Sequence, residues 1–302
     1  GASGVSGNIT QLTDALIEDN SLYIGNDPSA TTSTAEYNIA IGTTALDAIT
    51  TGDHNVAVGY NALTSNTTGE RNTANGFETL YANITGDGNV ANGFQALFSN
   101  TTGDKNTANG RYALNNNTEG SGNTANGNQA LLKNITGNYN TANGYLALNN
   151  NTEGSYNTAN GRYAMINTTT GSHNVASGRN ALSINTTGSE NTAIGSYAMV
   201  YNLTGSNNTA IGYNAGVDSN ALTNTTAIGN GASVNASNKI RLGNTDITVI
   251  EGQVAFSSSS DRRLKKDIVN TRYGLNTVLD LRPVDYQMKS NDLEQIGFIA
   301  QE

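Results

Sequence analysis

The chain has 302 residues and a mass of 31.4 kDa, and 34 of its residues are Gly, whereas Cys and Trp are absent. The net charge is −9, with no basic cluster before Arg262, and no apolar run approaches the roughly 18 residues that span a bilayer. We therefore expect no nucleic-acid partner, no membrane insertion, no cofactor and no metal site, and the lack of Cys excludes disulfides and thiolate chemistry.

Residues 1–37 are predicted to be an N-terminal connector, because only the segment Ser21–Gly25 resembles the pattern that follows. Since the chain begins at Gly1 without an initiator Met, we expect it to be a fragment or a processed product.

Residues 38–233 consist of twelve repeats of 17 residues, in which Asn recurs from Asn38 to Asn208 without a slip. The consensus is N-[TV]-A-x-G-x-x-A-[LM]-x-x-N-[TI]-[TE]-G-x-x, and we number its positions from the first Asn. Positions 3 and 5 are Ala and Gly in every repeat, position 8 is Ala except at Thr79, and position 9 is Leu or Met until Gly216 and Ser233.

Alternation in N-[TV]-A-x-G predicts a strand with one tightly packed face, and we expect a second strand at the Ala-Leu pair. The N-T-T-G and N-T-E-G segments predict turns, with residues of positive φ among them. The Asn-x-[ST] sequons, such as Asn66 and Asn134, are interpreted as the same turn chemistry. The predicted fold is all-β: a parallel β-solenoid or β-roll of 17-residue coils, about 58 Å long at roughly 4.8 Å per coil. Because one such coil buries little apolar surface, we expect partner chains.

The pattern N-x-A-[IV]-G-x-x-A-[LM], seen at Asn38–Gly42, Asn191–Gly195 and Asn208–Gly212, resembles the heads of trimeric autotransporter adhesins. The resemblance covers about 200 residues and implies a left-handed parallel β-roll that associates as a homotrimer. The adhesin repeat is typically shorter than 17 residues, so strand length or one turn must differ here.

Position 4 is Ile or Val in the outer repeats and Asn in six consecutive central repeats. If this column faces solvent, it is a polar stripe; if it faces a trimer axis, it lines a polar core that holds waters or ions. Both interpretations stay open. The residues of this candidate ladder are Asn75, Asn92, Asn109, Asn126, Asn143 and Asn160.

Positions 6 and 7 carry aromatic and Arg side chains in many repeats. We expect them to stack on the coils above and below, and the alternative is a stripe that contacts surface glycans. The candidate glycan-contact residues are Tyr112, Tyr145, Tyr163, Arg111, Arg162 and Arg179. His54 and His173 share a repeat position but lie seven coils apart, so they cannot share a metal ion.

The composition changes in the C-terminal part of the chain: 16 of the 196 residues in 38–233 are charged, against 14 of the 46 in 257–302. We predict a β-rich junction over 234–256 and a separate module over 257–302, with a helix that contains Leu275 and Leu279 and stops before Pro283.

The motifs S-D-R-R-L-K-K-D-I from Ser260, L-R-P-V-D-Y at 281–286 and I-G-F-I-A-Q-E at 296–302 resemble the endosialidase-type intramolecular chaperone. That domain follows trimeric phage tail spikes and tail fibres, promotes trimerisation and then cleaves itself off with a Ser–Lys dyad. The resemblance implies the start of an α+β chaperone domain, truncated here, with a cut between Ser260 and Asp261. It places the nucleophile at Ser260 and the base at Lys265, with Lys266 as the alternative base if the register differs by one residue.

The leading hypothesis is a homotrimeric virion fibre, most typical of a phage tail fibre, that contacts a host receptor or glycan. The alternative is a bacterial or other viral surface adhesin of the same architecture. An enzyme that acts on an external substrate, such as a polysaccharide depolymerase, is disfavoured because the repeats hold no clustered carboxylate pair.

Overall fold

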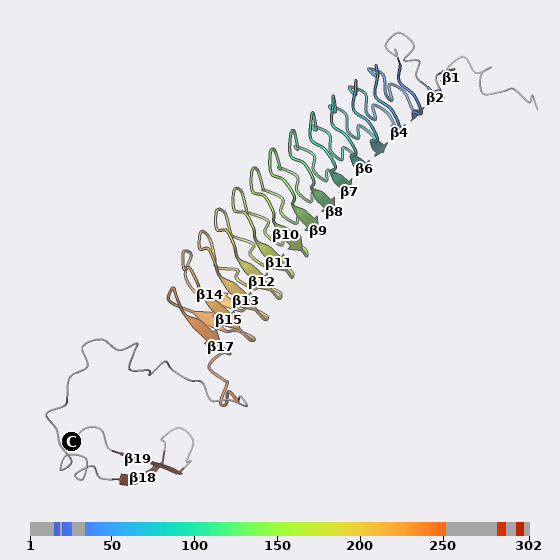
Figure 1. Cartoon of the computed structure of the whole chain (residues 1–302). Coiled ribbons are helices and arrows are strands. Elements are labelled where there is room, and N and C mark those ends of the chain that lie inside the picture. Colours follow the sequence, from blue (N-terminus) through green and yellow to red (C-terminus); the bar gives the residue numbers. More distant parts are fainter. Residues whose placement is uncertain (1–14, 19, 26–33, 252–282, 288–293, 299–302) are drawn as a thin grey trace, which may run out of the picture. The chain divides into compact units, whose positions relative to one another are not determined.

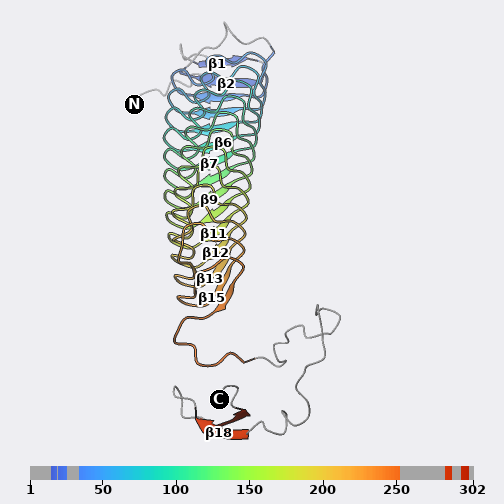
Figure 2. The same cartoon turned by 90° about the vertical axis from the view of Figure 1, so that its left-hand side faces the viewer.

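The computed structural model describes residues 15–18, 20–25, 34–251, 283–287 and 294–298. These form two units, one up to Thr248 and one from Val249 onward. The first unit is the predicted all-β parallel solenoid, with about 13 turns of 17-residue coils (Figures 1 and 2). No helix occurs among the described residues.

One fifteen-stranded sheet runs the length of the solenoid. β1 pairs antiparallel with β2, and every following pair is parallel and shifted by one coil, as in Ala108↔Ala125 and Asn109↔Asn126. The strands of this sheet are β1 (Ala15–Glu18), β2 (Ser21–Ile24), β3 (Ile39–Ile41), β4 (Val56–Val58), β5 (Thr73–Asn75), β6 (Val90–Asn92), β7 (Thr107–Asn109), β8 (Thr124–Asn126), β9 (Thr141–Asn143), β10 (Thr158–Asn160), β11 (Val175–Ser177), β12 (Thr192–Ile194), β13 (Thr209–Ile211), β15 (Thr226–Ile228) and β17 (Ile240–Leu242).

The apolar core consists of three columns, contributed by positions 3, 8 and 9 of each coil. The two Ala columns and the Leu/Met column are buried from the first repeat to the tenth. Position 3 points inward from the strand, and positions 2 and 4 point outward, as the alternation predicts. At the last turn Arg241 takes the inward position, pairs opposite Ala227 and donates a hydrogen bond from Nε to the Gly243 carbonyl at 3.0 Å.

The prediction of a second strand at the Ala-Leu pair is wrong for most coils, because that pair lies in a turn. The position 9 residue is left-handed, as in Leu131 with φ of 51°, and positions 7 and 17 are left-handed as well. A strand cannot continue through such a residue. Only where Gly216 and Ser233 replace Leu do two short paired strands form here, β14 (Gly216–Val217) and β16 (Ser233–Val234).

A column of asparagines at position 1 fills the polar part of the interior. Asn123 is fully buried, its backbone N–H donates to Oδ1 of Asn106 at 2.9 Å, and its Nδ2 donates to the Gly137 carbonyl at 2.8 Å. Its own Oδ1 accepts the backbone N–H of Asn140 at 2.9 Å, so the bonding repeats from coil to coil. The side chain thus pairs backbone groups at corners where no strand is available to pair them.

A second buried asparagine column occupies position 12. Where the preceding coil also has Asn at this position, Nδ2 donates to its Oδ1 and to the position 15 glycine carbonyl, as Asn117 does to Asn100 at 2.8 Å and to Gly120 at 2.8 Å. The sequon asparagines Asn66 and Asn134 belong to this column and are buried, which confirms the interpretation of the sequons as turn chemistry.

The glycines of the repeat are needed for two different reasons. At position 5, Gly127 has φ of +139°, and a Cβ there would lie 2.6 Å from the Gly144 carbonyl oxygen. At position 15, Gly86 has no positive φ, but a Cβ would lie 2.5 Å from both Asn83 Oδ1 and the Gly103 carbonyl oxygen. The expected positive φ in this turn therefore lies at position 17, and close approach explains the Gly at position 15.

In the second unit, the described residues form one antiparallel pair, β18 (Pro283–Gln287) and β19 (Glu294–Phe298). The helix expected around Leu275 and Leu279 lies outside the described residues.

Candidate functional site

Five of the six position 4 asparagines, from Asn92 to Asn160, form a continuous hydrogen-bonded ladder on the outer face of the sheet, and Asn75 lies in register before it. Nδ2 of Asn92, Asn109, Asn126 and Asn143 each donates to Oδ1 of the next residue in the column at 2.8 to 2.9 Å, and the last acceptor is Asn160. These residues are half-buried or exposed in the single chain, so the column lies outside the coil. The trimer-axis interpretation stays a prediction.

The aromatic residues at positions 6 and 7 stack between neighbouring coils, as expected. Tyr60, Phe77 and Phe94 stack nearly parallel, with centroid distances of 5.3 and 5.2 Å, and Tyr145 meets Tyr163 edge-on at 5.5 Å. The stacking restrains these side chains without burying them.

The arginines at position 6 lie over aromatic rings of the same column. The Arg162 guanidinium carbon lies 4.5 Å from the Tyr163 ring centre and 5.9 Å from the Tyr145 ring centre, and its Nη2 donates to the Tyr163 hydroxyl at 3.1 Å. Arg111 has the same relation to Tyr112 and Phe94, and Arg179 lies 5.4 Å from the Tyr197 ring centre. A guanidinium held over an exposed ring in this way can still donate its other N–H groups to anionic or hydroxyl-rich ligands.

A second aromatic column, which the sequence analysis did not single out, occupies position 17. Tyr139, Tyr156 and His173 stack with centroid distances of 5.2 and 4.9 Å, and Tyr37 stacks on His54 at 5.1 Å. The recurrence of aromatic residues at one repeat position was the available signal. Both histidines stack on tyrosines, and no group of three or more possible metal ligands occurs among the described residues.

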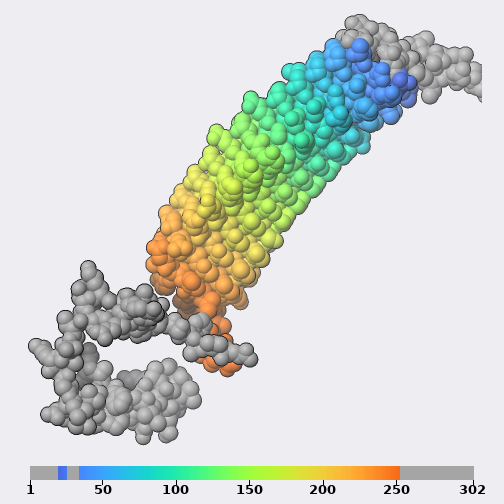
Figure 3. All heavy atoms as spheres, in the orientation of Figure 1, coloured from blue at the N-terminus to red at the C-terminus, as the bar shows by residue number. Residues whose placement is uncertain are grey.

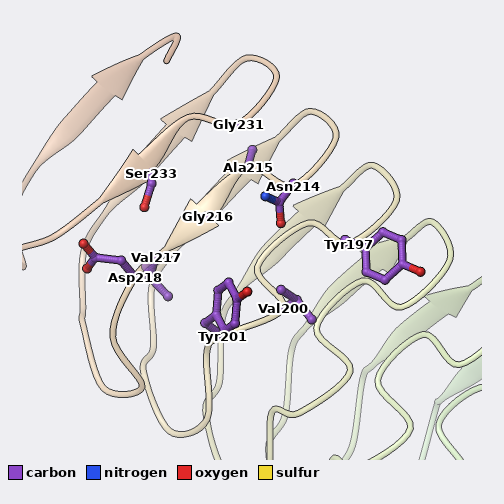
Figure 4. A pocket seen from close by; sticks show the side chains of 10 residues that line it. All are labelled: Tyr197, Val200, Tyr201, Asn214, Ala215, Gly216, Val217, Asp218, Gly231 and Ser233. Atoms are coloured by element: carbon purple, nitrogen blue, oxygen red, sulfur yellow. The ribbon is translucent and has the colours of Figure 1, made fainter. Parts of the chain in front are cut away.

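The repeat deviates in the last full coils, and a hollow opens there (Figure 4). Its volume is about 80 Å³, and Tyr197, Tyr201, Asn214, Asp218 and Ser233 are among the residues that line it. Ligand pockets usually measure about 300–1,000 Å³, so this hollow holds only a few waters or a small substituent.

A wider, polar hollow of about 280 Å³ adjoins the first and shares Asp218 and Ser233 with it. Arg241, Asn235 and Asn244 complete a lining of charged, amide and hydroxyl groups. This lining is suited to a polar ligand and offers no apolar floor.

The predicted cleavage residues Ser260, Asp261 and Lys265 lie outside the described residues. No helix of the described part is long and apolar enough to cross a membrane.

The C-terminal segment of the chain is similar to a known protein family. Residues 260–302 match the family model described as chaperone of endosialidase, which confirms the resemblance noted for this segment. The matched region begins at Ser260 and includes β18 and β19. No curated protein matches the chain. The chain thus joins a β-solenoid shaft to a segment that matches the chaperone of endosialidase.

Proposed function

We propose that this chain is part of a homotrimeric fibre on a virion, a phage tail fibre that attaches to a host surface. The observation that carries the proposal is the succession, in one chain, of a long repetitive shaft and a segment matching the chaperone of endosialidase. A bacterial or other viral surface adhesin with the same parts is the second candidate, supported by the likeness of the repeats to adhesin heads.

The regularity of the shaft supplies the reason for a chaperone. Because neighbouring coils carry the same columns at the same spacing, chains that associate one coil out of step meet nearly the same contacts. A terminal module that aligns the chains first removes these misaligned states from the folding pathway. Release of the module by cleavage then makes disassembly slow, which is kinetic stability.

The cleavage we propose is hydrolysis of the Ser260–Asp261 peptide bond. The Ser260 hydroxyl acts as nucleophile and Lys265 accepts its proton, which requires a Lys whose neighbours favour the neutral amine. Arg262, Arg263 and Lys266 are the cationic neighbours in the sequence. Ser260 Oγ attacks the carbonyl carbon of the scissile bond and forms an ester as the C–N bond breaks, and Lys265 passes the proton to the leaving amine of Asp261. One water then hydrolyses the ester, so the products are a carboxylate at Ser260 and an amine at Asp261.

For attachment, the exposed columns of Tyr and Arg offer the chemistry that recognises surface glycans: ring faces for the sugar and guanidinium N–H groups for its hydroxyls or acidic groups. We assign this contact to Arg111, Tyr112, Tyr145, Arg162, Tyr163 and Arg179.

The test uses the chain together with a complete chaperone domain and compares it with Ser260→Ala by intact mass and by native mass in solution. We expect a trimer of chains that end at Ser260, and uncleaved chains in the variant. Ser258→Ala, in the same Ser run, is the matched control and should cleave like the wild type. Cleavage that persists in Ser260→Ala would reject the nucleophile, and a monomeric wild type would reject the trimeric fibre.

A further inference from the structure

The outer face of the sheet changes character along the shaft. In the central coils its position 4 column is the amide ladder, whereas in β12, β13 and β15 the same column is Ile194, Ile211 and Ile228. These isoleucines are 43, 39 and 40% exposed, and Leu242 of β17 extends the column by one more strand. Figure 2 shows these strands at the C-terminal end of the sheet.

This apolar column is continuous, because each residue lies directly opposite the next in the parallel register. Its strand neighbours at position 2 are threonines in β12, β13 and β15, so the outer face of these three strands carries no charge. The central coils and the C-terminal coils thus share the pattern [TV]-A-x-G and differ at position 4, which is Asn in the central coils and Ile in β12, β13 and β15. The local fold does not require the isoleucines, since the coils with Asn form the same strand.

A second copy of this chain is the occupant that fits this face. The chain carries a net charge of −9, and because the outer positions of β12, β13 and β15 carry no charge, two copies can approach there without repulsion between these side chains. Its layers repeat at the pitch of the coil, so the same face of another copy, set in register, meets it layer by layer. These coils are also those closest in sequence to the segment that matches the chaperone of endosialidase.

We infer that the outer face of β12, β13, β15 and β17 is the surface through which copies of this chain associate, with Ile194, Ile211, Ile228 and Leu242 as its apolar core. The inference rests on the proposed homotrimer and specifies where that trimer is held together. The central amide ladder then carries little of the association, because its amides are already paired within each chain.

The test uses the full chain with Ile194→Asn, Ile211→Asn and Ile228→Asn combined. Each change installs the residue that the central coils carry at the same position, so the coil should fold as before. We expect unchanged far-UV circular dichroism and a monomer by analytical ultracentrifugation at concentrations where the wild type is a trimer.

The matched control combines Ile84→Thr, Ile135→Thr and Leu203→Thr. These residues occupy position 13, on another side of the coil, where most repeats carry Thr. Ile84 and Ile135 are as exposed as the isoleucines of the sheet, so loss of apolar surface is matched. We expect this control to remain a trimer.

Three outcomes decide the matter. A trimer in the triple Asn variant overturns this face while leaving the homotrimer intact, and a monomeric wild type overturns both. If the triple variant does not fold, Ile211→Asn alone decides. We expect the concentration of half-assembly to rise at least about tenfold, which for a trimer is about a hundredfold in the equilibrium constant, or about 2.8 kcal/mol per trimer; an unchanged concentration overturns the face.

Discussion

Asparagine supports this shaft at two buried columns, where each side chain ties its own coil to its neighbours. The position 1 and position 12 amides donate to the same position 15 glycine carbonyl, as Asn123 and Asn134 both do to Gly137. Fully paired, such networks stabilise a unique structure; an unpaired buried group costs about 1–3 kcal/mol. The columns are therefore sensitive to a single missing member.

One member is missing at Thr168, the only break in the position 12 column between Asn66 and Asn202. Asn151 Oδ1 is buried without a partner, because the coil above it has no amide to donate, and Asn185 Nδ2 lies 3.5 Å from the Thr168 hydroxyl. We predict that Thr168→Asn stabilises the chain by about 1–2 kcal/mol and raises Tm by a few degrees in thermal unfolding. Thr170→Asn, on the exposed side of the same turn, is the control and should leave Tm unchanged. No increase for Thr168→Asn would contradict the role of the column.

At the scale of the element, each three-residue strand of the repeat is followed by a glycine at position 5, where the backbone of the next coil lies too close for a Cβ atom. A side chain at position 5 would meet the backbone of the next coil, while position 17 accepts Arg71, Lys105 or a tyrosine at a positive φ near 55°. Position 5 is therefore restricted to Gly mainly because the next coil lies so close, and less because its φ is positive.

We predict that Gly127→Ala destabilises the chain by at least about 3 kcal/mol, because the Cβ at φ of +139° meets the Gly144 carbonyl. Gly88→Ala is the matched control: its φ is +64° and its Cβ would meet only Lys105 Cγ at 3.7 Å, so we expect a change below about 1 kcal/mol. Urea unfolding measures both. Equal losses in the two variants would refute close approach as the cause.

At the scale of the whole shaft, every coil contacts its neighbours through the same columns, and Figure 3 shows the rows of atoms that follow the coils. Stability is then nearly a sum of coil and interface terms, and the number of coils sets length without changing the fold.

We predict that deletion of residues 123–139, one complete coil, is tolerated. The coil that starts at Asn140 then stacks on the coil that starts at Asn106, and all columns continue. Small-angle scattering should show a shaft shorter by about 4.8 Å, with Tm within a few degrees of the wild type. Deletion of residues 123–130 leaves half a coil and should unfold the neighbouring region. Similar damage from both deletions would contradict the nearest-neighbour description.

The sequence alone determined the coil length, the parallel stacking, the inward Ala of the strand, the stacked aromatic column and the segment that matches the chaperone of endosialidase. Each of these follows from strict recurrence or from a contiguous motif, which one chain displays without any knowledge of its neighbours. The sequence alone did not reveal that the Ala-Leu pair lies in a left-handed turn, because Leu ordinarily avoids that conformation. Only the tertiary structure showed that the asparagines of positions 1 and 12 are buried and paired while those of position 4 are outside. The same residue type serves all three columns, and only the path of the backbone decides which face of the coil each one occupies.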